Sequence, residues 1–114
     1  MTVADTLPLL DLRTYTIALR RMGEFLDVVD RLMMPVQLKY LRPPLFMATS
    51  AVGSLNQVVH VWQFDDMADF EHRHAARDAD PDWPAYLKAS GPMITAQENK
   101  LIRRVVLASL DARS

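Results

Sequence analysis

The sequence predicts an α+β fold in which one four-stranded antiparallel sheet carries helices on one of its faces. Two observations predict it. Four segments show the alternation of side-chain character that is typical of strands, and the segments between them have apolar residues three or four apart, as helices do. The order along the chain is strand, helix, strand, strand, helix pair, strand. This is the split βαβ order of ferredoxin-like domains.

The composition indicates one ordinary globular domain. The chain has 114 residues, of which 50% are hydrophobic and 24% are charged, so we expect a single domain over residues 1–114 with an ordered core of about residues 8–108. The net charge of −1 gives no general attraction to nucleic acid or to an anionic membrane. The absence of cysteine excludes disulfides, a thiolate zinc site and a cysteine nucleophile.

The first strand and the first helix are predicted from a change of period. Pro8–Ile17 alternates and is rich in β-branched residues, and the apolar positions of Met22–Val36 fall three and four apart. Pro35 lies inside the helical pattern, so we expect a kink or break near Met34. The prolines at 43 and 44 end the helix. In the strand, one face carries Leu10, Leu12, Thr14 and Thr16, and the other carries Asp11, Arg13, Tyr15 and Ile17.

A hairpin follows. Leu45–Val52 and Asn56–Asp65 are predicted strands, and Gly53 with Ser54 forms the turn between them. Both faces of the second of these strands carry large apolar side chains, which indicates a central strand covered on both sides. One face of it carries Asn56, Val58, His60, Trp62 and Phe64.

The predicted helix pair and last strand complete the order. A helix over Met67–Arg77 is capped by Asp66, and its polar side carries Glu71, Arg73, Arg77 and Asp78. A second helix has Asp80 as its N-cap and Pro81 as its first residue, and the Gly-Pro pair at 91 and 92 ends it. The last strand is expected within Gln97–Leu107.

The sheet face without helices leads to a prediction about assembly. It carries apolar groups over a larger area than a monomer normally exposes, so we expect a homodimer, sheet against sheet, in a dimeric α/β barrel. Residues Met1–Thr6 have neither the positive charge nor the apolar stretch of a targeting segment, and no apolar run approaches the roughly 20 residues of a membrane span. A cytoplasmic protein is the expectation.

Four residues are candidates for contact with a ligand. His60, near Trp62 on its strand face, would act as an acid or base or orient a polar ligand; otherwise it is a core or interface histidine. Arg13 and Tyr15 share a strand face and would hold a carboxylate or a phenolate; otherwise Arg13 pairs with an acid such as Asp11, Glu98 or a partner-chain carboxylate. Tyr15 and His60 are the candidate catalytic residues.

The other polar and aromatic candidates have simpler interpretations. Asn99 and Arg103 in the last strand fit the polar lining of a sheet interface. His72 and His74 lie two apart on a helix and cannot share a metal, so no metal is expected. A haem would need an axial histidine such as His60 or His74, but no motif supports one, and no cofactor is expected. Two interpretations fit Trp62, Trp83 and Tyr86: they line an aromatic pocket, or they are part of the core.

Five stretches resemble the NIPSNAP family of the dimeric α/β-barrel superfamily. They span nearly the whole chain: DLRTYT (Asp11–Thr16), MPVQLKYL (Met34–Leu41), LNQVVHVWQFDD (Leu55–Asp66), ADPDW (Ala79–Trp83) and QENKLIR (Gln97–Arg103). The chain departs from the family pattern at Asp11, where glutamate is usual, and at Gln63 and Phe64, where a basic-aromatic pair is common. The resemblance implies the ferredoxin-like fold and dimerisation. Sister families include cofactor-free monooxygenases, isomerases and haem proteins.

Three functions are consistent with these residues. The first is a NIPSNAP-like homodimer that binds a small organic ligand between sheet and helices through Arg13, Tyr15, His60 and Trp62. The second is a cofactor-free monooxygenase or isomerase that uses Tyr15 and His60 to handle protons and Arg13 to hold an anion. The third is a scaffold or partner-binding module without a pocket. No interaction with nucleic acid or membrane is expected.

Overall fold

The computed structural model describes residues 7–111 of the chain, so the predictions on Met1–Thr6 lie outside the described residues. The elements are β1 (Leu9–Ile17), α1 (Met22–Val28), the π-helical turn η2 (Val29–Met33), α2 (Met34–Tyr40), β2 (Phe46–Thr49), β3 (Gln57–Phe64), α3 (Met67–Asp78), α4 (Trp83–Ser90), the 3₁₀ turn η3 (Gly91–Met93), β4 (Ile94–Arg103) and α5 (Ala108–Asp111). The predicted α+β, ferredoxin-like order is confirmed.

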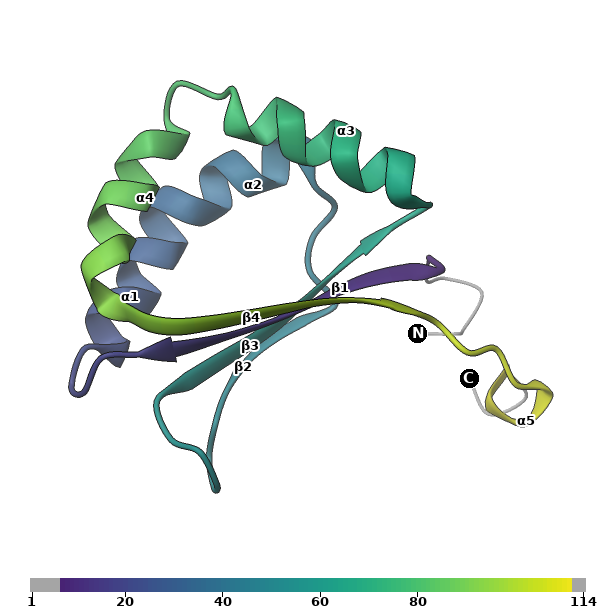
Figure 1. The fold of residues 1–114 in the computed structure, drawn as a ribbon, viewed down its shortest axis with the longest axis horizontal. Helices are drawn as coiled ribbons and strands as arrows, with labels where there is room; N and C mark the ends of the chain where they lie inside the picture. The colour runs from purple at the N-terminus through teal and green to yellow at the C-terminus, as the bar shows by residue number, and fades with distance from the viewer. Residues whose placement is uncertain (1–6, 112–114) are drawn as a thin grey trace.

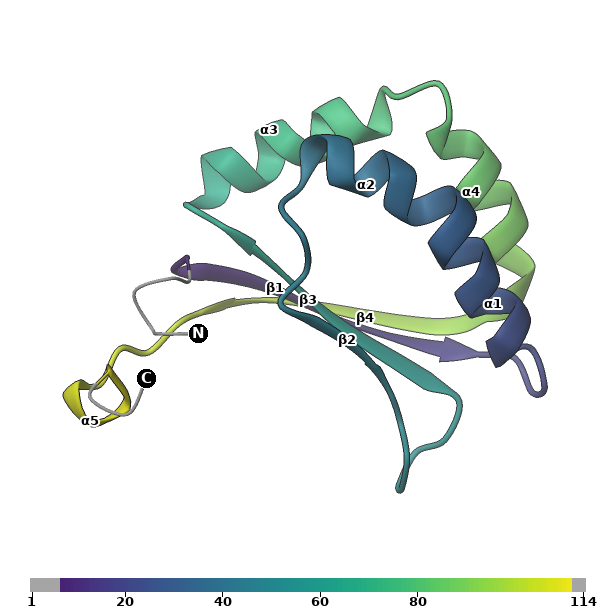
Figure 2. The ribbon, with the colours of Figure 1, turned by 180° about the vertical axis from the view of Figure 1, so that it is seen from behind.

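The strands form one open sheet in the order β2-β3-β1-β4, with every neighbouring pair antiparallel. Helices α1 to α4 arch over one face of this sheet, and none of the helices within residues 7–111 lies over the other face (Figure 1; Figure 2 shows the view from behind). Arg13 in β1 pairs with His60 in β3 and with Asn99 in β4. This register confirms which residues of β1 and β3 share a face.

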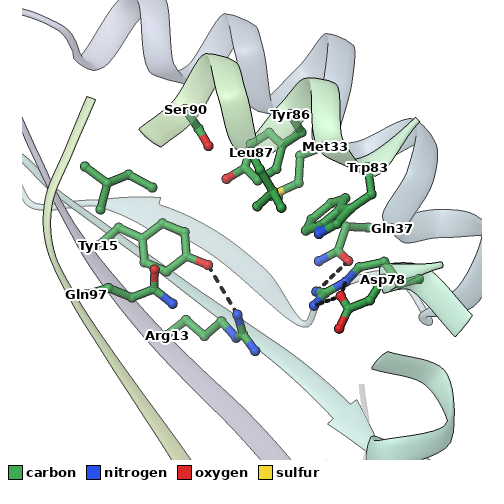
Figure 3. A pocket seen from close by; sticks show the side chains of 12 residues that line it. Arg13, Tyr15, Met33, Gln37, Asp78, Trp83, Tyr86, Leu87, Ser90 and Gln97 are labelled. Atoms are coloured by element: carbon green, nitrogen blue, oxygen red, sulfur yellow. Dashed lines mark hydrogen bonds and ion pairs between the residues drawn. The ribbon is translucent and has the colours of Figure 1, made fainter. Parts of the chain in front are cut away.

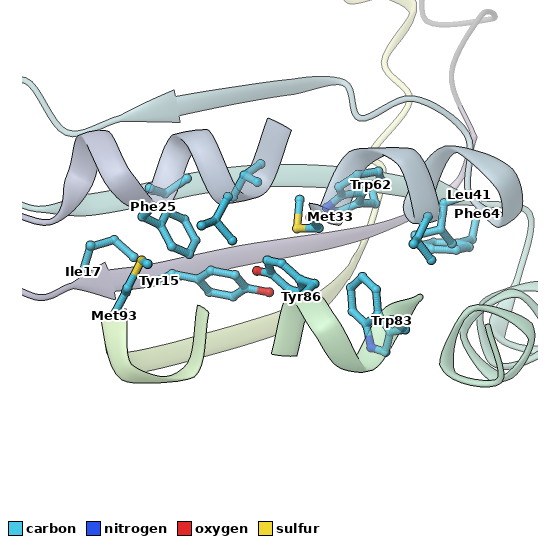
Figure 4. Close-up of a cluster of buried hydrophobic side chains, with 14 of the residues drawn as sticks. Tyr15, Ile17, Phe25, Met33, Leu41, Trp62, Phe64, Trp83, Tyr86 and Met93 are labelled. Atoms are coloured by element: carbon cyan, nitrogen blue, oxygen red, sulfur yellow. The ribbon is translucent and has the colours of Figure 1, made fainter. Parts of the chain in front are cut away.

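The core fills the layer between the sheet and the helices. Tyr15 and Ile17 rise from β1 and Trp62 and Phe64 from β3, to meet Phe25 and other apolar residues of the helices (Figure 4). Successive side chains of β1 and β3 point to opposite faces of the sheet. Every second residue therefore reaches this layer, and the residues between them reach the uncovered face.

The uncovered sheet face keeps apolar side chains accessible. Phe46 in β2 is 51% exposed and Ile102 in β4 is 39% exposed, and Leu10, Leu12 and Val59 lie between them partly buried. Beyond β4 the chain runs away from the body of the molecule to α5 (Figure 1). That segment exposes Val105, Val106, Leu107 and Leu110.

The predicted irregularity near Met34 is present as a π-helical turn. The N–H of Met34 donates to the carbonyl of Val29, five residues back, and Pro35 is the second residue of α2. In a regular α-helix the ring of Pro35 would collide with the carbonyl four residues earlier, at Arg31. The wider turn accommodates the proline, and the helix then continues to Tyr40.

Two predicted strand boundaries were wrong. The second strand covers only Phe46–Thr49 instead of Leu45–Val52, and the last covers Ile94–Arg103 instead of a part of Gln97–Leu107. The partners set these limits. The two ends of β4 pair with the two ends of β1, Ile94 with Ile17 and Arg103 with Leu9.

The start of α4 also differs from the prediction. The helix begins at Trp83 with Asp82 as N-cap, so Asp80 is not the cap and Pro81 is not helical. The buried carboxylate of Asp80 instead accepts hydrogen bonds from the Tyr40 hydroxyl at 2.7 Å and from the N–H of Asp82 at 2.8 Å. The local sequence pattern predicts that Asp80 caps the helix, but in the structure its side chain binds Tyr40, which is distant in the sequence. At the other end, Gly91 keeps a right-handed helical conformation, and the 3₁₀ turn η3 leads into β4.

His74 is an unusual member of the layer under α3. Its ring lies 4.2 Å from that of Phe70 and 5.6 Å from that of Phe64. Its buried Nε2 makes no hydrogen bond within the described residues and lies 3.9 Å from the Asp11 carboxylate, beyond hydrogen-bond reach. Burial, with smaller effects of Arg77 and Arg13, lowers the pKa of His74 to about 4, against the opposing effect of Asp78.

We predict that His74→Phe reduces the pH dependence of stability. Unfolded histidine titrates near pH 6.5, whereas folded His74 titrates near pH 4. Between these values the unfolded state binds more protons, so the free energy of unfolding falls as the pH decreases. The variant has no such loss. The difference in free energy of unfolding, variant minus wild type, should therefore be larger at pH 5 than at pH 7.5 by about 1–2 kcal/mol. Denaturant unfolding at both pH values measures it.

The matched control for this experiment is His72→Phe, a change on the exposed side of the same helix. It should leave the pH dependence as it is in wild type. Equal pH dependence of His74→Phe and His72→Phe would contradict the assignment.

Candidate functional site

A pocket of about 380 Å³ lies between the sheet and the helices, on the side where α4 faces β1 and β4 (Figure 3). Side chains from the sheet form one wall, and side chains from η2, α2, α4 and the end of α3 form the other. Its main polar residues are Arg13, Tyr15, Gln37, Arg77, Tyr86 and Ser90. Its apolar surface comes chiefly from Met33, Trp83, Leu87 and Ile94.

Arg13 is held at the pocket by Asp11. Its Nε donates to the carboxylate of Asp11 at 2.8 Å, and its Nη1 donates to the Tyr15 hydroxyl at 3.4 Å. Burial opposes the charged form of Arg13, but Tyr15 and Asp11 outweigh it and raise the pKa above its usual value. Arg13 therefore stays positively charged. Its pairing with Asp11 is one of the alternatives that the sequence predicts for this residue.

Tyr86 brings a second hydroxyl to the pocket from α4. The residue is 3% exposed, and its hydroxyl has no partner of standard hydrogen-bond geometry in the described chain, although Ser90 lies close enough to affect it. Burial raises the pKa of Tyr86 to about 12, with Tyr15 adding to the effect and Ser90, Arg13 and Arg77 opposing it. Tyr86 is thus a protonated donor at neutral pH.

Arg77 forms the end of the pocket next to α3. Its guanidinium lies 4.4 Å from the centre of the Trp83 ring, donates to Gln37 at 3.1 Å through Nη1, and donates to Asp78 at 3.0 Å through Nε and 2.8 Å through Nη2. Stacking and three hydrogen bonds hold this group in place. Both arginines are paired with an aspartate, but Arg77 uses all three of its nitrogens in hydrogen bonds, whereas Arg13 uses Nε and Nη1 only.

The structure brings two of the four predicted ligand-contacting residues to the pocket. Arg13 and Tyr15 line it, whereas His60 and Trp62 are buried behind Tyr15 and do not line it. The ring of His60 meets that of Tyr15 edge-on at 4.8 Å, and its Nδ1 accepts a hydrogen bond from the Trp62 indole at 2.7 Å. Burial, with a smaller effect of Arg13, lowers the pKa of His60 to about 4, so it is neutral near pH 7.

The pocket also contains residues that sequence reasoning treated differently. Trp83 and Tyr86 were weighed between core and pocket, and they belong to both. Arg77 was placed on the polar side of its helix, but it is buried. The sequence gives little sign of this burial, because Arg77 meets the ring of Trp83 only in the folded chain.

The remaining candidates lie elsewhere. Asn99 and Arg103 are exposed on β4, and Asn99 accepts a hydrogen bond from Gln97 at 3.2 Å. His72 is exposed on α3, beside a shallow groove that Lys39 and Arg73 also line. Between residues 7 and 111, no three histidine or acidic side chains gather closely enough to hold a metal ion.

The fold and the pocket define the class of protein: a ferredoxin-like α+β domain with a ligand-sized cavity between sheet and helices. The chain belongs to the NIPSNAP family, whose model matches residues 10–108. A NIPSNAP family protein of unknown function from Agrobacterium tumefaciens is 27% identical, with a TM-score of 0.84 over 91% of this chain and 94% of that one. A NIPSNAP domain protein from Burkholderia xenovorans is 29% identical, with a TM-score of 0.80 over 88% and 95%.

More distant structures share the fold alone. A putative antibiotic biosynthesis monooxygenase from Nitrosomonas europaea has a TM-score of 0.65 at 7% identity, over 86% of this chain and 99% of that one. Among functionally curated proteins, none is similar enough in sequence to be counted as a relative. Within residues 7–111, every helix is too short or too polar to cross a membrane.

We predict that His60→Phe destabilises the protein through Trp62. The substitution removes the acceptor of the buried indole N–H, and an unpaired buried donor costs about 1–3 kcal/mol. Denaturant unfolding should show a loss of that order in the free energy of unfolding. In the double variant with Trp62→Phe the donor is gone too, so the double loss should be smaller than the sum of the single losses. Additive losses would contradict the coupling.

Proposed function

We propose that this protein is a homodimer that binds a small organic ligand in the pocket between the sheet and α4. The observation that carries the proposal is the pocket itself. Its volume of about 380 Å³ falls within the range of about 300–1,000 Å³ that small-molecule sites occupy. Fixed polar groups and apolar walls meet in it, and that combination orients a small ligand.

Binding without catalysis is favoured over the cofactor-free enzyme. The enzyme hypothesis needs Tyr15 and His60 at the same ligand, but only Tyr15 lines the pocket. His60 is 2% exposed, and its Nδ1 is occupied by the Trp62 indole. The hypothesis of a scaffold without a pocket is disfavoured, because closely packed side chains at Arg13 and Tyr15 would leave no cavity of this size.

The binding proposal can be tested with a substitution that narrows the pocket. Leu87 lines it and is 52% exposed, so Leu87→Trp should fill space there without disturbing the core. We expect a fragment screen by ligand-observed NMR to find compounds that bind wild type, and Leu87→Trp to weaken them at least about tenfold. The control is Leu38→Trp, a change at a residue of α2 that is 48% exposed and does not line the pocket.

Two outcomes would contradict the binding proposal. One is a screen without binders, and the other is a set of binders that Leu87→Trp and Leu38→Trp affect equally. In the second case the compounds bind at another place on the protein.

Dimerisation is supported by the two apolar surfaces that a single protomer leaves accessible. Phe46 and Ile102 lie on the uncovered sheet face, and Val105 and Val106 are 68% and 66% exposed in the segment beyond it. Exposed apolar side chains that gather on one face are typical of protein–protein interaction sites. A two-fold dimer brings the same face of each copy together and removes both patches from water. A cytoplasmic location remains the expectation from the sequence.

The dimer can be tested at its proposed interface. Phe46→Glu places a charge on the uncovered sheet face at a residue that is 51% exposed in one protomer, so the protomer should still fold. We expect wild type and the control Leu38→Glu to scatter light as dimers at micromolar concentration, and Phe46→Glu to shift toward the 13.0 kDa monomer. A wild-type protein that is folded and monomeric at that concentration would rule out this part of the proposal.

A further inference from the structure

We propose that the ligand of the pocket is a small monocarboxylate with a flat apolar body, held by the guanidinium of Arg13 and the hydroxyl of Tyr86. This inference rests on the proposed binding function and adds the chemical class of the ligand.

The guanidinium of Arg13 has donors to spare. Nε is used by Asp11 and Nη1 makes one long contact with Tyr15, while none of the partners of Arg13 in the described chain engages Nη2. Figure 3 shows the guanidinium between the Tyr15 hydroxyl and the Asp78 end of the pocket. Nη1 and Nη2 together present parallel N–H groups, the arrangement that matches the two oxygens of a carboxylate.

The hydroxyl of Tyr86 is the second donor. It is buried, it lines the same pocket as Arg13, and Ser90 is its one polar neighbour, without a hydrogen bond of standard geometry in the described residues. A buried hydroxyl in a poor hydrogen bond is costly in the free protein. A ligand that fills the pocket and carries an acceptor would give this hydroxyl a better partner.

The donors of the pocket favour an anion, although its charges balance. Arg77 is paired with Asp78 through two of its nitrogens and donates to Gln37 through the third. Arg13 is paired with Asp11 through Nε alone, so its Nη2 faces no acidic partner among the described residues. A neutral ligand offers Nη1 and Nη2 a weaker acceptor than a carboxylate does, and that costs affinity. A phenolate offers one oxygen to the two donors, whereas a carboxylate offers one oxygen to each.

The size and walls of the pocket fix the rest of the ligand. Its volume of about 380 Å³ lies at the lower end for small-molecule sites, which suits one ring or a short chain. The indole of Trp83 and the side chains of Leu87 and Ile94 present apolar surface beside the donors. The expected ligand therefore carries a single acid group on a compact apolar body.

The experiment compares an acid with its neutral isostere. Phenylacetate and phenylacetamide have the same ring and nearly the same shape, so the ratio of their dissociation constants, measured by titration calorimetry or NMR, reports what the charge and the second acceptor oxygen of the carboxylate contribute. We expect phenylacetate to bind wild type at least about tenfold more tightly than phenylacetamide. Arg13→Gln should abolish this preference, and the exposed arginine variant Arg103→Gln should retain it.

A second variant covers the case in which Arg13→Gln fails to fold because Asp11 is left unpaired. Tyr86→Phe leaves the pair of Asp11 and Arg13 intact and removes a hydroxyl whose one polar neighbour is Ser90, without standard hydrogen-bond geometry, so its melting temperature should fall little. Its affinity for phenylacetate should fall about tenfold, and its affinity for phenylacetamide should change less.

The outcomes separate this inference from the proposed function. If neither compound binds at millimolar concentration, nor any fragment of the screen, the binding function itself is wrong. If the amide binds as tightly as the acid, ligand binding stands and the carboxylate assignment is overturned. A Tyr86→Phe variant that loses stability but keeps the full affinity for phenylacetate would show that the hydroxyl is structural.

Discussion

The ion pair between Asp11 and Arg13 is the interaction on which the polar end of the pocket depends. Both residues face the helices from the central strand β1, and their side chains are 2% and 14% exposed. Two charges at this depth must stay paired, because removal of either leaves the other buried without compensation. The bond from Nε also fixes the orientation of the guanidinium, so Nη1 and Nη2 are presented to the pocket.

The pocket persists because the groups around it cannot collapse onto one another. The guanidinium of Arg77 is held on the ring of Trp83 and by Gln37, which ties the end of α3 to α4 and α2. Tyr15 is supported from behind by the ring of His60, which is itself fixed by Trp62. A protein core packed to normal density has few voids larger than a water molecule. A cavity many times larger, with donors at one end, has the properties of a binding site.

The fold was predictable from the sequence because strand faces alternate and helix stripes recur at three and four residues. The alternation in β1 placed Arg13 and Tyr15 together correctly, since two residues of one strand face share a side whatever the rest of the chain does. Features that depend on contacts between elements were not predictable. Asp80 was assigned to a helix cap but binds Tyr40, and Arg77 was assigned to a solvated face but is buried on Trp83.

The two proposed surfaces share one strand. In β1, Leu10 and Leu12 point to the uncovered sheet face, and Asp11, Arg13 and Tyr15 alternate with them toward the pocket. A partner packed on the leucines therefore rests on the backbone that positions the guanidinium, with no intervening layer. Any coupling between the two sites is reciprocal: whatever ligand binding adds to the stability of the dimer, dimerisation adds to the affinity for the ligand. A strand that faced water on one side would have no such link, because nothing on that side would respond to the ligand.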